Sequence, residues 1–293
     1  MAEFSPTEAV FAGFRFVRER PATLLIWSAF LLVVMALALV AMFDLGGDQM
    51  TALLAASQAT PFDPAQITKL SQAIAPASSF ALLRMVVFGS VLVTAILRVR
   101  LEPGNHPWGG LRFGGDELRV LGANAMTLLA VFLAETIVAL AADFSAQAGL
   151  PPIVVVLVGF LLIVCLQVRL SLTAVVAMVE KRIALGRSWA LTGKGFWSLL
   201  GAYVLLLAIV LVILFLIVIL FSALMASVAL AGGRGDPLAI LLANDFGGLN
   251  VVVVALYAVM NMAQVWLSMV LLAASLSMNV DAYKAFAAQL PRV

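Results

Sequence analysis

Residues 197–228 read WSLLGAYVLLLAIVLVILFLIVILFSALMASV and contain no charged side chain. A helix that crosses the hydrocarbon core of a bilayer needs about 20 consecutive apolar residues, so this stretch predicts a membrane-spanning helix. It is longer than one crossing requires, and we expect the helix to tilt, break or project into the cytoplasm. A transmembrane barrel would instead show short segments of alternating hydrophobicity.

The rest of the chain has the same character, since 64% of its 293 residues are hydrophobic and 11% are charged. Soluble domains have about 45–50% apolar and about 25% charged residues. The sequence therefore predicts an all-α integral membrane bundle of about six transmembrane helices, forming a single domain over residues 1–293. Besides Trp197–Val228, the predicted spans are Ala22–Phe43, Ala75–Leu97, Val120–Ala141, Pro152–Val179 and Leu249–Ser277.

The basic residues predict the orientation. Only Lys69 and Arg234 fall on one side of these spans, and Arg84 lies within the second span. Because Lys and Arg gather in cytoplasmic loops, both termini are expected in the cytoplasm. Arg outnumbers Lys and Ala is abundant, which indicates a GC-rich bacterial genome. The expected localisation of this multi-span protein is the bacterial inner membrane. The other side of the spans holds Arg15, Arg18, Arg20, Arg98, Arg100, Arg112, Arg119, Arg169, Lys181, Arg182, Arg187, Lys194, Lys284 and Arg292.

Two segments are predicted to lie along the cytoplasmic interface. In residues 1–21, Ser5 is the expected N-cap of an amphipathic helix, with Pro6 in its first turn and Glu8 completing a capping box. Such a helix suits the headgroup layer. The segment Ser171–Val179 follows the fourth crossing, and we expect it to be a second amphipathic helix at the interface.

Arg84 and Glu135 are ionisable residues inside predicted spans. An ionised side chain in hydrocarbon costs about 2.5–3.5 kcal/mol and should have a partner. At 1.5 Å per residue, the two lie roughly 21 and 24 Å from the cytoplasmic edge, so we predict an ion pair between them. The pair can form a polar site for a proton, an ion or a lipid headgroup. It can also fix helix register, and Arg84 can alternatively reach outward to lipid phosphate.

Asn261 and Gln264 lie three residues apart and share a face near the middle of the sixth span. Asn124 and Gln167 are further polar residues within the spans. Hydrogen bonds between helices are the simplest role for such residues, and each contributes around 0.6 kcal/mol.

Motifs for catalysis and metal binding are missing from the sequence. It contains no H-E-x-x-H, P-loop, G-x-S-x-G or dinucleotide-binding pattern. Its one cysteine and one histidine, Cys165 and His106, exclude a Cys/His zinc cluster. The acidic pair Asp116-Glu117, close to Arg112 and Arg119, is better explained by a charged interface than by acid–base catalysis. We therefore expect no enzyme activity, no metal and no cofactor.

The stretch from Arg169 to Gly201 carries a recognisable pattern. It reads RLSL (169–172), VE (179–180), ALGRSWALT (184–192), GFW (195–197) and LG (200–201). This pattern resembles one in bacterial multi-span proteins similar to the membrane domain of glycerophosphoryl diester phosphodiesterases, a largely uncharacterised family of about six spans. The family usually has Pro shortly after Arg-Ser-Leu, where this chain has Ala174-Val175. The resemblance implies the membrane module without the catalytic domain, and it brings no catalytic residues.

The same stretch is rich in basic residues. These side chains can hold anionic phospholipid headgroups, at about 1 kcal/mol each, or can simply set the topology. The candidates for headgroup contacts are Arg169, Lys181, Arg182, Arg187 and Lys194.

These features favour a membrane adaptor, scaffold or regulatory module as the function. The alternative is a transporter or lipid-handling protein that uses Arg84 and Glu135 as a polar intramembrane site. The expected partners are the lipid bilayer, with anionic phospholipids among its lipids, and another membrane protein. No nucleic-acid partner is expected.

Overall fold

The computed structural model describes residues 4–58, 64–102, 104, 106–149, 151–232 and 251–289, and all regular structure within them is helical. The elements are α1 (Pro6–Arg18), α2 (Pro21–Gln58), α3 (Pro64–Leu101), η1 (Pro107–Gly110), α4 (Gly115–Gln147), α5 (Pro152–Leu170), α6 (Thr173–Val179), α7 (Leu185–Gly232) and α9 (Val251–Ala287).

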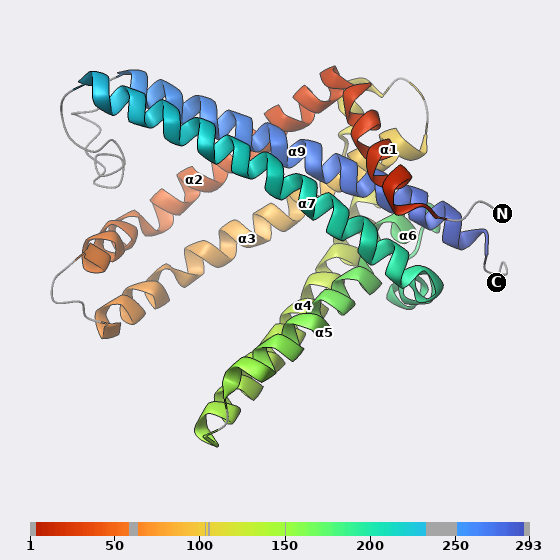
Figure 1. Cartoon of the computed structure of the whole chain (residues 1–293), viewed down its shortest axis with the longest axis horizontal. Coiled ribbons are helices and arrows are strands. Elements are labelled where there is room, and N and C mark those ends of the chain that lie inside the picture. The colour runs from red at the N-terminus through yellow and green to blue at the C-terminus, as the bar shows by residue number, and fades with distance from the viewer. Residues whose placement is uncertain are drawn as a thin grey trace.

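The long helices form three hairpins that diverge from one region (Figure 1). Helix α2 pairs with α3, α4 with α5, and α7 with α9, while α1 and α6 lie where the hairpins meet. We call this meeting region the junction (residues 4–31, 89–102, 106–125, 165–206 and 265–289). The outer parts of the hairpins (residues 32–58, 64–88, 126–164, 207–232 and 251–264) are called the arms.

Five of the described helices are long and apolar enough to cross a membrane, which confirms an all-α membrane fold. Their apolar segments are Pro21–Ala38, Gly115–Gln147, Ile153–Val179, Gly195–Leu224 and Val259–Ala287. The predicted second span, residues 75–97, lies within α3, which is not among these five. Arg234 and Arg292 lie outside the described residues.

Helix α1 begins at the predicted N-cap, although the described hydrogen bonds do not include the one from the Ser5 N–H to the Glu8 carboxylate that would complete the capping box. Ser5 has extended backbone angles and accepts a hydrogen bond from the backbone N–H of Glu8 at 3.5 Å, and Pro6 occupies the first turn. The helix buries Val10, Phe16 and other apolar residues against the junction. Its contact with α9 is very close, because a Cβ at Gly13 would lie 2.6 Å from the carbonyl oxygen of Ala274.

Helix α6 is the centre of the junction. All residues from Thr173 to Met178 are buried, and α6 contacts α3, α4, α7 and α9. Val175 packs in one apolar cluster with residues such as Trp27 and Ile96, while Val176 packs in a second cluster with residues such as Leu199. The expectation of an amphipathic interfacial helix over Ser171–Val179 is therefore wrong. Helices α3, α4, α7 and α9 cover this segment, and the sequence pattern of the segment itself does not indicate their positions.

Candidate functional site

The most deeply buried charged pair of the junction joins α3 to α4. The guanidinium of Arg98 is 2% exposed and donates to Oε1 of Glu117, which is 4% exposed, at 2.5 Å. Arg98 also donates to the carbonyl oxygen of Gly110 at 2.5 Å. A buried charge is tolerated only when it is paired and hydrogen-bonded, and these contacts supply both conditions.

Asp116, next to this pair, forms ion pairs with basic side chains from several segments. Its carboxylate accepts hydrogen bonds from Arg119 at 2.8 Å and from Lys181 at 2.9 Å. Arg98 and Arg112 approach the same carboxylate at 3.9 Å. Asp116 thus ties α3 and α4 to the turn after α6, where Lys181 adopts a left-handed backbone with φ of 55°.

The loop between α3 and α4 contacts α2 and α3 through its backbone. Gly109 and Gly110 have φ of 64° and 75°, a region that glycine adopts without steric cost. The indole Nε1 of Trp27 donates to the carbonyl oxygen of Gly109 at 2.9 Å. A Cβ at Gly110 would lie 3.3 Å from the backbone of Ala95, so the turn lies directly against α3.

Glu180 forms a second acidic centre at the end of α6. It accepts hydrogen bonds from Arg182 at 2.9 Å and from Arg187 at 3.0 Å, and the hydroxyl of Tyr283 lies 3.4 Å away. Burial by itself raises the pKa of Glu180. The hydrogen bonds and charges of Arg182 and Arg187 outweigh burial, and the pKa is held below its ordinary value.

Arg169 has a different environment from the other basic residues. Its guanidinium lies over the rings of Trp189 and Phe196, at 5.3 and 5.2 Å from their centroids, and Nη1 donates to the carbonyl oxygen of Trp189 at 3.4 Å. Within the part of the chain that the structure describes, no carboxylate forms an ion pair with Arg169. The side chain is thus a cation held by aromatic rings.

The five candidates for lipid-headgroup contacts are therefore not equivalent. Lys181 pairs with Asp116, and Arg182 and Arg187 pair with Glu180, whereas Arg169 forms no ion pair among the described residues. The side chain of Lys194 lies outside the described part of the structure.

The ion pair predicted between Arg84 and Glu135 is not among those that the structure shows between described residues, and Glu135 is exposed on α4. The register of α3 against α4 accounts for this difference. Asn124 donates to Ser90 at 3.0 Å, and from that contact Arg84 is six residues away while Glu135 is eleven residues away. At 1.5 Å per residue, this five-residue difference separates the two charges by roughly 7.5 Å along the helices.

The polar residues of the predicted spans differ in burial and in hydrogen bonding. Asn124 forms the interhelical hydrogen bond that was predicted for it. Asn261 is half-buried on α9, while Gln264 is exposed. The prediction that Asn261 and Gln264 act together stays a prediction.

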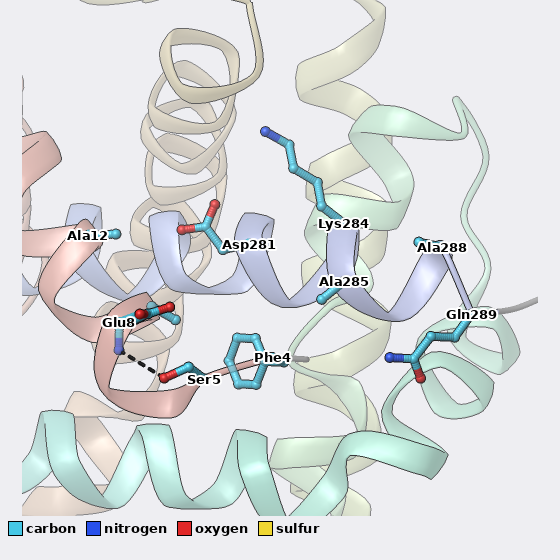
Figure 2. Close-up of a pocket in the computed structure, with 10 residues that line it drawn as sticks. Phe4, Ser5, Glu8, Ala12, Asp281, Lys284, Ala285, Ala288 and Gln289 are labelled. Carbon is cyan, nitrogen blue, oxygen red and sulfur yellow. Dashed lines mark hydrogen bonds between the residues drawn. The ribbon is translucent and has the colours of Figure 1, made fainter. Parts of the chain in front are cut away.

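A pocket of about 470 Å³ lies between α1 and the end of α9 (Figure 2). Its lining includes Glu8, Asp281 and Lys284, which carry both signs of charge. Asp281 already binds Arg100 at 2.8 Å. The mixture of charges indicates a hydrated groove at the surface of the junction.

No group of three His, Cys, Asp or Glu side chains in the described residues can hold a metal ion. The carboxylates of Asp116, Glu117, Glu180 and Asp281 form ion pairs with basic side chains, and several of these pairs join helices to one another. Comparison with protein-family models, curated proteins and solved structures finds no match to this chain. The resemblance to the membrane domain of glycerophosphoryl diester phosphodiesterases therefore stays a prediction.

The sequence reasoning missed the buried Arg98–Glu117 pair and treated Arg98 as a charge that sets topology. One signal was present in the sequence. The basic residues Arg98 and Arg100 end one helix, and a helix C-terminus favours positive charge. After a short loop, the acidic residues Asp116 and Glu117 begin the next helix, and a helix N-terminus favours negative charge.

Proposed function

We propose that this chain is a membrane adaptor whose arm α4 binds a transmembrane helix of another protein. The observation that carries the proposal is Glu135, an exposed carboxylate within the apolar segment of α4. Leu128, Phe132 and Ala139 are also exposed and lie on its face at spacings of three to four residues. Facing lipid, this carboxylate would cost about 2.5–3.5 kcal/mol, so a polar or basic group from another helix is the expected neighbour.

The arrangement of the arms supports the same function. Only 6% of the apolar segment of α4 and 6% of that of α7 is buried inside the chain, compared with 39% for α9. Because the junction holds the hairpins apart, long apolar faces stay accessible to partner helices. The alternative is a transporter or lipid-handling protein that uses Arg84 and Glu135 as a polar intramembrane site.

Site-specific photocrosslinking in the native membrane tests the proposal. A photoreactive residue at Leu128, Phe132 or Ala139 should capture one protein, identified by mass spectrometry. The same residue at Val138, which faces Gly159 of α5, should not. Glu135→Leu should lower capture from Phe132 about three- to tenfold, the loss expected for one interhelical hydrogen bond. Asp143→Asn, an exposed change further along α4, is the matched control.

Three results would overturn the adaptor function: crosslinks to lipid alone, equal capture from Val138, or capture that is insensitive to Glu135→Leu. Capture of a second copy of this chain would replace the adaptor with a homo-oligomer.

A further inference from the structure

The groove between α5 and α7 separates the second hairpin from the third. It contains a pocket of about 410 Å³, lined on one side by Val164, Val168 and Ser171 and on the other by Leu200, Val204 and Leu207. These side chains are mainly apolar. The lining begins in the junction and reaches the arms at Val164 and Leu207. Apolar chains of lipid size can therefore lie along this groove.

Arg169 lies beside this groove, between Val168 and Ser171 of its lining along the sequence. The ring of Phe196, which Arg169 contacts, lies one helical turn before Leu200 of the lining on α7. The carbonyl oxygen of Arg169 accepts hydrogen bonds from Ser188 at 2.8 Å and from Thr192 at 3.3 Å. These contacts fix the segment that carries the guanidinium.

Aromatic residues mark this level as a membrane–water boundary. Trp197 is 79% exposed and packs edge-on against Phe196, and Trp189 is 48% exposed beside Arg169. Tryptophan is enriched at the depth of lipid headgroups. By this criterion Arg169, which forms no ion pair among the described residues, lies at headgroup depth, and the apolar groove lies at the depth of acyl chains.

The guanidinium also lies close to the backbone of α7. Residue 193 is glycine, and a Cβ at that position would lie only 3.3 Å from Nη1 of Arg169, so glycine allows this close approach. The guanidinium has five N–H donors in a planar fork that matches phosphate oxygens.

From this juxtaposition we propose that Arg169 and the α5–α7 groove form a binding site for one anionic phospholipid. The guanidinium of Arg169 binds the phosphate, and an acyl chain lies between Val164, Val168, Val204 and Leu207. The other basic residues of the same surface contribute less, because Arg182 and Arg187 form ion pairs with Glu180 and Lys181 forms one with Asp116.

Native mass spectrometry of the full chain tests the site, with phosphatidylglycerol and phosphatidylcholine of the same acyl chains as probes. Wild type should retain one phosphatidylglycerol in preference to phosphatidylcholine. Arg169→Gln should lower that retention about fivefold, because one basic residue near the surface contributes about 1 kcal/mol. Arg182→Gln, the matched control, removes the same charge from a residue that is already paired and should retain the lipid.

Val204→Trp tests the groove independently, since Val204 is exposed and a larger side chain fills the pocket without entering the core. It should lower retention while the melting temperature stays within a few degrees of wild type. If Arg169→Gln fails to fold, Val204→Trp and Arg169→Lys, which keeps the charge, decide the question.

Equal retention by wild type and Val204→Trp would overturn the site, as would equal affinity for the two lipids or equal loss in Arg182→Gln. Displacement of the bound lipid by glycerophosphoglycerol, which lacks acyl chains, would overturn the role of the groove. These outcomes are independent of the adaptor proposal, which depends on α4 and on a protein partner.

Discussion

The junction and the arms are parts of the same helices, yet they stabilise the protein in different ways. The junction buries Arg98, Glu117 and the whole of α6 behind several helices, and ionic contacts join segments that are distant in the sequence. The arms expose rows of leucine, valine and phenylalanine along α4, α5 and α7. The tertiary contacts that stabilise the protein are therefore concentrated at one end of the spans. The loss of stability caused by a substitution should depend on whether it falls in the junction or in an arm.

The largest effect is expected from Arg98→Met. This change removes a buried guanidinium and leaves the carboxylate of Glu117 buried without its partner. Breaking a buried ion pair from one side costs about 3–5 kcal/mol. The free energy of unfolding in detergent micelles, followed by circular dichroism, measures this loss.

Arg112→Met is the matched control, because Arg112 is 61% exposed and lies 3.9 Å from Asp116. It should cost less than about 1 kcal/mol, as exposed ion pairs do. If both variants lost the same stability, the junction would not be the stabilising region that the comparison requires.

An intermediate effect is expected from Gly13→Ala. The new methyl group would lie 2.6 Å from the carbonyl oxygen of Ala274, so α1 must move away from α9. Overpacking of this kind costs about 1–3 kcal/mol. The thermal unfolding midpoint in micelles should fall.

Gly201→Ala provides the contrasting substitution on α7, since a Cβ there meets no atom within 4 Å. Alanine is favoured over glycine inside helices by about 0.5–1 kcal/mol, so the same measurement should show an unchanged or higher midpoint. A fall in both midpoints would indicate that helix position, rather than contact with α9, determines the outcome.

The smallest effect is expected from pH. The folded-state pKa of Glu180 lies below its ordinary value of 4.5, so its contacts stabilise the protein above that pH. This stability is lost as the pH falls from about 4.5 through the lower folded-state value. Glu180→Gln should remove this part of the pH dependence, with a change below about 1 kcal/mol at neutral pH because the pairs are partly exposed.

Unfolding midpoints of wild type and Glu180→Gln between pH 7 and pH 3 provide the measurement. If the midpoints of the two proteins changed with pH in parallel, the contacts of Glu180 would not contribute to the pH dependence of stability.

The sequence predicted the membrane fold for a simple physical reason. A run such as residues 197–228 leaves no alternative to a helix in lipid, because each backbone N–H and carbonyl group must be satisfied within its own segment. The cap at Ser5 was predictable for a similar reason, since it depends on neighbours within three residues.

The contacts of the junction were not predictable in the same way. Arg84 and Glu135 looked equivalent in depth, but the contact between Ser90 and Asn124 fixes a register that places them at different depths. The burial of α6 likewise depends on α3, α4, α7 and α9 together. Pairwise spacing along one chain segment carries no information about such contacts.

The packing of α1 on α9 also has a consequence for biosynthesis. Helix α1 is synthesised well before α9, against which it packs, and Ala274 of α9 is the neighbour of Gly13 in α1. A nascent chain that has inserted α2 to α5 still lacks Met278, Val280 and the other α9 residues that complete the core. We therefore expect insertion to proceed hairpin by hairpin while tertiary assembly waits for α9, so that chains terminated before α9 remain unassembled substrates for membrane proteases.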